Sequence, residues 1–140
     1  KVMPFSKILL PMAPEEPDAS MHALEVAREL LREGGEIHTL TVLEVPPGYL
    51  KGYLTDAQIT ELAEKHREAR RETPNGMASN KVVKGHPAQA ILEEAEALGA
   101  DCIVLAAHSP GAQSFLLGST SARVVRRANC SVMVVRQGTI

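Results

Sequence analysis

Short apolar runs alternate with longer amphipathic stretches along this chain, and the alternation occurs five times. Each apolar run is rich in Val, Ile or Leu and is bounded by Pro, Gly or polar residues, as is typical of buried strands. The pattern predicts strands over residues 6–12, 37–45, 81–84, 101–107 and 131–136.

Helix start and stop signals separate the first two strands. Proline cannot donate to a strand ladder, so Pro11 predicts the end of the first strand. Asp18 or Ser20 is expected to cap the helix that follows, and the pair Gly34-Gly35 is expected to end it.

Three further helices are predicted in the rest of the chain. Thr55-Asp-Ala-Gln58 has the spacing of a capping box, and the helix that it opens ends before residues 74–76. Pro87 suits the first turn of a helix that Gly99 terminates, and residues 119–129 form the last helix.

Strands separated by helices predict parallel pairing with right-handed crossovers. We therefore expect an α/β fold, a doubly wound five-stranded parallel sheet of flavodoxin-like order 3-2-1-4-5, in a single domain over residues 1–140. In this order the chain reverses direction between strands 1 and 4, and ligands bind at the carboxyl ends of those strands.

Composition narrows the function classes. The 140 residues are 44% hydrophobic but only 3% aromatic, and the net charge is −2. Few aromatics disfavour a flavin-type electron carrier and a stacking platform for single-stranded nucleic acid. The chain has no excess of basic residues that would indicate a nucleic-acid partner. Its longest apolar runs are far shorter than the roughly eighteen residues of a membrane span, and no export signal is evident. We expect a cytoplasmic protein.

Gly118-Ser119-Thr120 opens the last helix after a loop that carries Pro110 and Gly111. Strand, glycine-bearing loop and helix N-terminus place backbone N–H groups against an anion, which indicates phosphate binding. The alternative is an ordinary helix start with Ser119 or Thr120 as its cap.

Catalytic and metal-binding patterns are not evident. No nucleophile with a base and no pair of carboxylates stands out, and the histidines are scattered, so we expect neither an enzyme nor a metal site. Cys102 and Cys130 lie in or beside apolar runs and are expected to be reduced and buried.

Several segments together resemble the universal stress protein family, in particular the small single-domain members with a His-x-Pro loop. The specific block is Leu116-Leu-Gly-Ser-Thr-Ser-Ala-Arg-Val-Val-Arg-Arg-Ala-Asn-Cys-Ser-Val-Met-Val-Val135, and the loop reads His108-Ser109-Pro110. Weaker matches are Ile8-Leu-Leu-Pro11, Leu40-Thr-Val-Leu43, Gly85-His-Pro-Ala88 and Asp101-Cys-Ile-Val-Leu105.

The resemblance implies a stress-response protein, a homodimer formed through the last strand, and ATP or another adenine nucleotide in the crevice. Gly118-Ser119 matches the end of the family's nucleotide signature, whereas Ala106 and Ser109 stand in place of its first two glycines and Ala13 in place of an acid. The candidate nucleotide-binding residues are Pro11, Met12, Ala13, Val42, Ala106, His108, Ser109, Gly111, Gly118, Ser119 and Thr120. The departures leave open an interaction or regulatory protein of the same fold without nucleotide.

Overall fold

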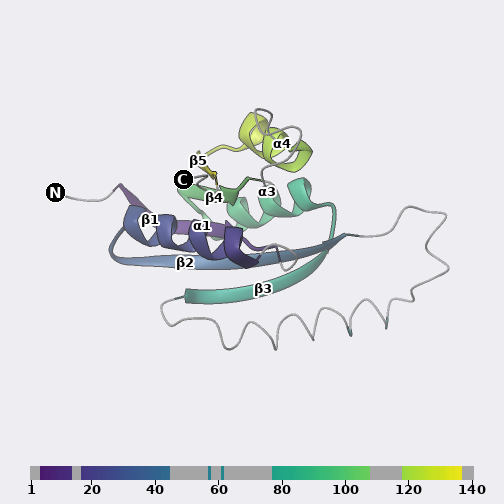
Figure 1. Ribbon diagram of the computed structural model, residues 1–140, viewed down its shortest axis with the longest axis horizontal. Helices are drawn as coiled ribbons and strands as arrows, with labels where there is room; N and C mark the ends of the chain where they lie inside the picture. The colour runs from purple at the N-terminus through teal and green to yellow at the C-terminus, as the bar shows by residue number, and fades with distance from the viewer. Residues whose placement is uncertain are drawn as a thin grey trace.

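A computed structural model describes residues 4–13, 17–44, 57, 61, 77–107 and 118–136 (Figure 1). The elements are β1 (Phe5–Pro11), α1 (Pro17–Leu30), β2 (Leu31–Glu44), β3 (Met77–Gly85), α3 (Pro87–Leu98), β4 (Cys102–Ala106), α4 (Ser119–Arg127) and β5 (Ser131–Val135). The expected helix that opens near Thr55 falls mostly outside the described residues, although Ala57 and Glu61 are both helical.

The strands form one five-stranded sheet of order β3-β2-β1-β4-β5, and every ladder in it is parallel. This confirms the predicted fold class and strand order. Parallel neighbours place all the carboxyl ends of the strands at one edge of the sheet and all the amino ends at the other. The two edges therefore carry different chemistry.

Alternate residues of the central strands supply the cores on the two faces of the sheet. Ile8 and Leu10 pack with Leu24 of α1, whereas Leu9 packs with Ile91 of α3 and Val124 of α4, and all six side chains are buried. Successive side chains of a strand point to opposite faces, so one apolar run serves both layers. Figure 1 shows α3 and α4 side by side and apart from α1.

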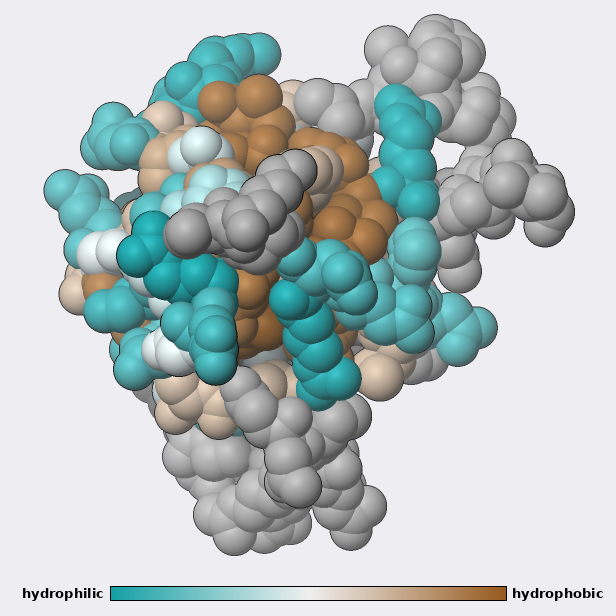
Figure 2. All heavy atoms as spheres, turned by 90° about the vertical axis from the view of Figure 1, so that its left-hand side faces the viewer, coloured by the Kyte–Doolittle hydropathy of each residue, from teal (hydrophilic) through white to brown (hydrophobic). Residues whose placement is uncertain are grey.

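Hydrophobic residues gather at the centre of the face shown in Figure 2, with hydrophilic residues around them. Among the helices that the structure describes, none is long and apolar enough to cross a membrane.

The first crossover differs from the prediction. Helix α1 ends at Leu30 rather than at the glycine pair, and β2 begins at the next residue. The ladder with β1 is irregular there: Phe5 pairs with Leu31 but Lys7 pairs with Glu36, so β2 carries extra residues. Gly34 takes φ +81°, and a Cβ at Gly35 would lie 2.9 Å from the Ser6 carbonyl oxygen. The glycines thus serve a bulge in the strand and not a helix end.

The predicted cap of α1 is wrong, whereas the predicted ends of α3 are confirmed. Asp18 and Ser20 both lie inside α1, which starts at Pro17, so the prediction that either caps this helix is wrong. For α3 the predictions are confirmed, because Pro87 occupies the first turn and Gly99 ends the helix in the left-handed conformation. Strand β3 is longer than expected and spans Met77–Gly85.

The carboxylate of Asp101, just before β4, holds the start of β1. One oxygen accepts the Ser6 N–H and the Ser6 hydroxyl, both at 2.9 Å, and the other accepts the Lys7 N–H at 3.0 Å. Burial alone raises the pKa of Asp101, but the hydrogen bonds from Ser6 and Lys7 outweigh it and hold the pKa below its ordinary value of 3.8. The carboxylate is therefore ionised at neutral pH.

Replacing this acid tests its contribution. Asp101→Asn puts an amide N–H₂ among N–H donors, and we expect a loss of about 1–2 kcal/mol in the free energy of unfolding at neutral pH. Because the folded pKa is depressed, the wild-type advantage exists above the unfolded pKa and disappears as the pH falls through the folded pKa. Urea unfolding from neutral pH to pH 3 measures both. An equal stability gap at every pH would contradict this account.

Candidate functional site

The sheet opens between β1 and β4 at its carboxyl edge. The ladder between these strands consists of Ile8 paired with Cys102 and Leu9 paired with Ile103. Beyond that point each strand follows its outer neighbour: the Met12 N–H donates to the Leu40 carbonyl of β2 at 2.7 Å. On the other side the Ala107 N–H donates to the Val135 carbonyl of β5 at 2.8 Å. This is the switch point at which open α/β sheets bind ligands.

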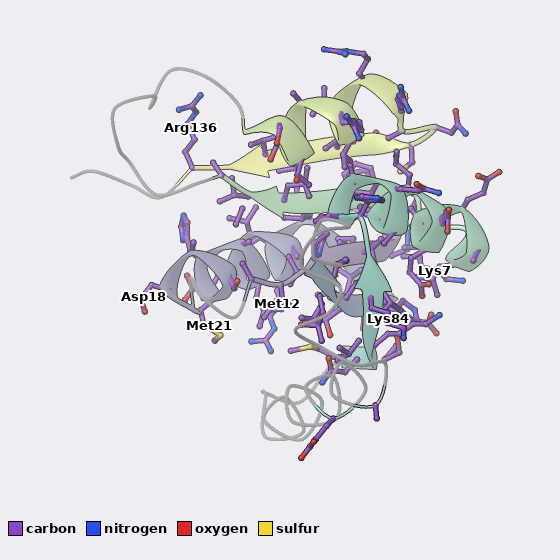
Figure 3. The ribbon with its side chains drawn as sticks, turned by 90° about the vertical axis from the view of Figure 1, so that its right-hand side faces the viewer. Lys7, Met12, Asp18, Met21, Lys84 and Arg136 are labelled. Carbon is purple, nitrogen blue, oxygen red and sulfur yellow. The ribbon has the colours of Figure 1, made fainter. Side chains whose placement is uncertain are left out.

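The chain leaving β1 is fixed by α1. The Ala13 N–H donates to the Ser20 hydroxyl at 3.0 Å, and this hydroxyl lies 3.3 Å from the Ala13 carbonyl, to which it can donate. Met12 is 8% exposed and packs into the core on the α1 face, as Figure 3 shows beside that helix. Asp18 and Met21 of the same helix project away from the sheet. Met12 and Ala13 therefore border the crevice mainly with their backbone.

The other strand residues predicted for the site lie on opposite faces. Ala106 packs against the same core as Met12, whereas Val42 packs against the core under α3. Val42 lies two residues beyond Leu40, whose carbonyl accepts the Met12 N–H, so its backbone continues along the same edge. The structure thus brings the ends of β1, β2 and β4 to one edge, with the Val42 side chain turned to the other face.

Helix α4 begins without a side-chain cap. Its N-cap is Gly118, and no side chain bonds to the first turn from that position. The Gly118 carbonyl accepts the Ala122 N–H at 2.9 Å, so the N–H groups of Ser119, Thr120 and Ser121 precede the first intrahelical bond. The alternative in which Ser119 or Thr120 is the N-cap is wrong. No acidic residue lies in the first turn, and Arg126 and Arg127 lie in the last.

Three predicted site residues lie outside the described part of the chain, namely His108, Ser109 and Gly111. The other eight are described. Because β4 and β5 are parallel, α4 runs back from the carboxyl edge, and its first turn lies at the same edge as Pro11 and Ala106.

A buried hydroxyl beside the crevice escaped the sequence analysis. Thr41 is completely buried, and its Oγ1 has no hydrogen-bond partner among the residues that the structure describes. It follows Leu40 directly, which pairs with Pro11 at the end of β1. A threonine in a strand signals only β propensity, so no pattern in the chain distinguishes Thr41 from other strand residues.

Other expectations concern groups away from this edge. Cys102 and Cys130 are free thiols, and burial, aided by the charge of Cys130 and Asp101, raises the pKa of Cys102 to about 11. Cys130 is only partly buried and lines a cavity of about 250 Å³ between the C-terminal ends of α3 and α4. That cavity lies toward the amino ends of β4 and β5, away from the crevice.

The fold is that of parallel α/β proteins with a ligand crevice at the switch point. A family model described as the universal stress protein family matches residues 4–136, and the chain belongs to that family.

Two relatives span nearly the whole chain. It is 30% identical over 144 aligned positions to universal stress protein G of Shigella flexneri, covering 94% of this chain and 99% of that one. It is also 30% identical to universal stress protein MJ0531 of Methanocaldococcus jannaschii, covering 95% and 83%.

Solved structures agree with the fold. The hypothetical protein MJ0577, solved to assign its biochemical function, is 26% identical, with a TM-score of 0.76 and coverage of 99% and 100%. A universal stress protein solved in complex with cAMP is 21% identical, with a TM-score of 0.59 and coverage of 94% and 97%, which shows a shared fold alone.

Thr41 and Thr39 form a matched pair for testing the unpartnered hydroxyl. Both are buried in β2, but the Thr39 hydroxyl lies 2.9 Å from Asn80 Oδ1, to which it donates. We expect Thr41→Val to leave the free energy of unfolding unchanged or raise it, and Thr39→Val to lower it by about 1 kcal/mol. Urea unfolding of both variants measures this. Equal losses in the two would show that the Thr41 hydroxyl is already satisfied.

Proposed function

We propose that this chain binds an adenine nucleotide at the carboxyl edge of the sheet, with the phosphates on the first turn of α4. The uncapped N-terminus of that helix carries the proposal. Its free N–H groups and the positive end of the helix dipole favour an anion, and no acidic side chain in the first turn opposes one. Ser119 and Thr120 add hydroxyl groups at the same place.

The base then lies beside the end of β2, where the backbone of Val42 supplies hydrogen-bonding groups. The remaining described residues of the proposed site, Pro11, Met12, Ala13 and Ala106, lie at the edge between these two points. The cAMP complex of a protein with this fold is compatible with nucleotide binding here.

Binding weaker than that of a protein with the full glycine signature is expected. Ala106 adds a Cβ where the signature has glycine, and Ala13 supplies no acid. These features favour the second candidate function, an interaction or regulatory protein whose crevice holds no nucleotide. For either function we propose a cytoplasmic stress-response module with no ATP turnover, since the described residues of the proposed site include no acid, base or arginine.

Gly118 offers a clean test of the phosphate site. Its φ of −64° and ψ of 161° suit any residue, so a substitution changes bulk and not backbone strain. We expect Gly118→Val to lower nucleotide affinity at least tenfold, because a branched side chain covers the first-turn N–H groups, and Gly118→Ala to have a smaller effect. Titration calorimetry with ATP, ADP and AMP gives the affinities.

Thermal unfolding of both variants is the control for folding. If the wild-type protein binds none of the three at millimolar ligand, the nucleotide proposal fails and the interaction protein stands. Equal affinity of wild type and Gly118→Val would place the phosphates elsewhere.

We further propose a homodimer formed through β5. This strand is the last in the described sheet, and an edge strand offers unpaired N–H and C=O groups to a second copy. Met133 of β5 is 39% exposed, which adds apolar surface at the same edge.

Two equally exposed methionines allow a matched test of the dimer. Met133→Lys places a charge at the proposed interface, whereas Met21→Lys changes a residue of α1 that is 40% exposed. We expect the β5 variant to sediment as a monomer at micromolar concentration and the α1 variant to remain dimeric like the wild type. A monomeric wild type would refute the dimer, and a dimeric Met133→Lys would exclude β5 as its interface.

A further inference from the structure

Three polar side chains of β2 and β3 form a continuous hydrogen-bonded relay. The imidazole of His38 is the centre: its Nδ1 lies 2.6 Å from the Ser79 hydroxyl oxygen, and its Nε2 lies 3.0 Å from Glu36 Oε1. A serine hydroxyl, an imidazole and a carboxylate in this order form the arrangement that activates serine nucleophiles on unrelated folds. Glu36 and Ser79 lie in the amino-terminal halves of β2 and β3, and His38 lies at the middle of β2.

A β-bulge brings the hydroxyl to the ring. Glu36 and His38 are two residues apart on β2 and so share a face of the sheet. On β3 the register runs from Ile37 paired with Met77 to His38 paired with Ser79, so Ala78 is an extra residue. A regular ladder would set Ala78 opposite His38. The bulge replaces that methyl group with a hydroxyl, which is the re-aiming of a side chain that bulges provide next to active sites.

In this relay the imidazole that would act as the base is shielded from solvent, whereas the serine that would act as the nucleophile is exposed. The His38 side chain is 11% exposed, whereas Ser79 is exposed to solvent. Exclusion of water strengthens the hydrogen bond between the imidazole and the hydroxyl, and exposure leaves the hydroxyl accessible to a reactant.

The carboxylate sets the tautomer of the ring. The hydrogen bond with His38 is the main cause that lowers the pKa of Glu36; desolvation opposes it, and the positive charge of Lys7 lowers the pKa further. Lys7 is held nearby by a hydrogen bond from its Nζ to the Leu98 carbonyl at 3.0 Å (Figure 3). An ionised Glu36 accepts a hydrogen bond only from an Nε2–H, which leaves the Nδ1 lone pair to accept the hydrogen bond of the Ser79 O–H.

We propose that Ser79 is a nucleophile that takes the acyl group of small activated esters, with His38 as its base and Glu36 as a positioning residue. The Ser79 oxygen bonds to the ester carbonyl carbon while its proton passes to His38 Nδ1. The bond to the leaving oxygen then breaks, and that oxygen departs with the electron pair and takes up the proton. Water later releases the acyl group as the acid and restores the hydroxyl.

The unpaired side of the outermost described strand, β3, can stabilise the oxyanion. Strand β3 is the outermost of the described strands on its side, and an edge strand has alternate N–H groups that no ladder uses. Such N–H groups are the donors that stabilise tetrahedral intermediates in acyl transfer. We expect acylation of Ser79 to be independent of nucleotide, because Ser79 lies near the start of β3 whereas the proposed nucleotide site lies at the carboxyl ends of the strands.

The test is acetylation of the full chain by p-nitrophenyl acetate, followed by release of p-nitrophenol and by mapping of the acetyl group with mass spectrometry. We expect a burst of product and acetyl on Ser79 in the wild-type protein. Ser79→Ala should lose both, and His38→Gln should slow acetylation about 100-fold, the contribution of a general base. Ser131→Ala, which changes an exposed serine of β5, is the matched control and should react like the wild type.

Glu36 requires a readout of its own. Nitrogen NMR of the His38 ring reports the tautomer, and we expect the Nε2–H form in the wild type and a mixture in Glu36→Gln, together with slower acetylation. Mapping on the wild-type protein needs no variant, so the test survives if a variant fails to fold. Acetyl groups on lysines but not on Ser79, or a Ser79→Ala variant that reacts as fast as the wild type, would overturn the proposal.

Discussion

The contact between β1 and β4 is the constraint on which the rest of the structure depends. These strands are separated by about two thirds of the chain, and their ladder has two pairs of residues. The Asp101 carboxylate adds three hydrogen bonds at the amino edge, and the Asp101 N–H donates to the Lys7 carbonyl at 2.9 Å. Because β1 and β4 are hydrogen-bonded only toward their amino ends, each strand is paired only with its outer neighbour, β2 or β5, at the carboxyl end.

That asymmetry creates the switch point at the carboxyl edge, where open α/β sheets bind ligands. Beyond Leu9 and Ile103 the ladder between β1 and β4 stops, while β1 stays paired with β2 up to Pro11 and β4 with β5 up to Ala106. The groups left at the edge are mainly backbone N–H and C=O groups, with the first turn of α4 beside them. Because backbone groups are common to all residues, the hydrogen-bonding groups at this edge do not depend on the side chains of Ala13 and Ala106.

Toward the amino ends of β2 and β3 the groups that carry the proposed chemistry are side chains and not backbone groups. Ser79 meets His38 only because one extra residue in β3 shifts the register. Glu36 and Lys7 are cross-strand neighbours on the adjacent ladder. One sheet thus offers backbone donors at one end and a relay of side chains toward the other, and the two can evolve separately.

The sequence by itself determined the order of elements, because short apolar runs and amphipathic stretches have different periods that a one-dimensional pattern retains. Local signals were reliable where the cause was local: Pro87 and Gly99 bound α3 as expected. The residues of the specific C-terminal block also indicated the family and the first turn of α4 as a candidate site.

Tertiary structure alone decided what depends on contacts between distant segments. Gly34 and Gly35 serve a bulge against β1 and not a helix end, and Ser20 fastens the Ala13 backbone instead of capping α1. The pairing of His38 with Ser79 joins residues 41 positions apart through a register shift. No pattern along the chain encodes such a shift, because register is fixed by the packing of the whole sheet.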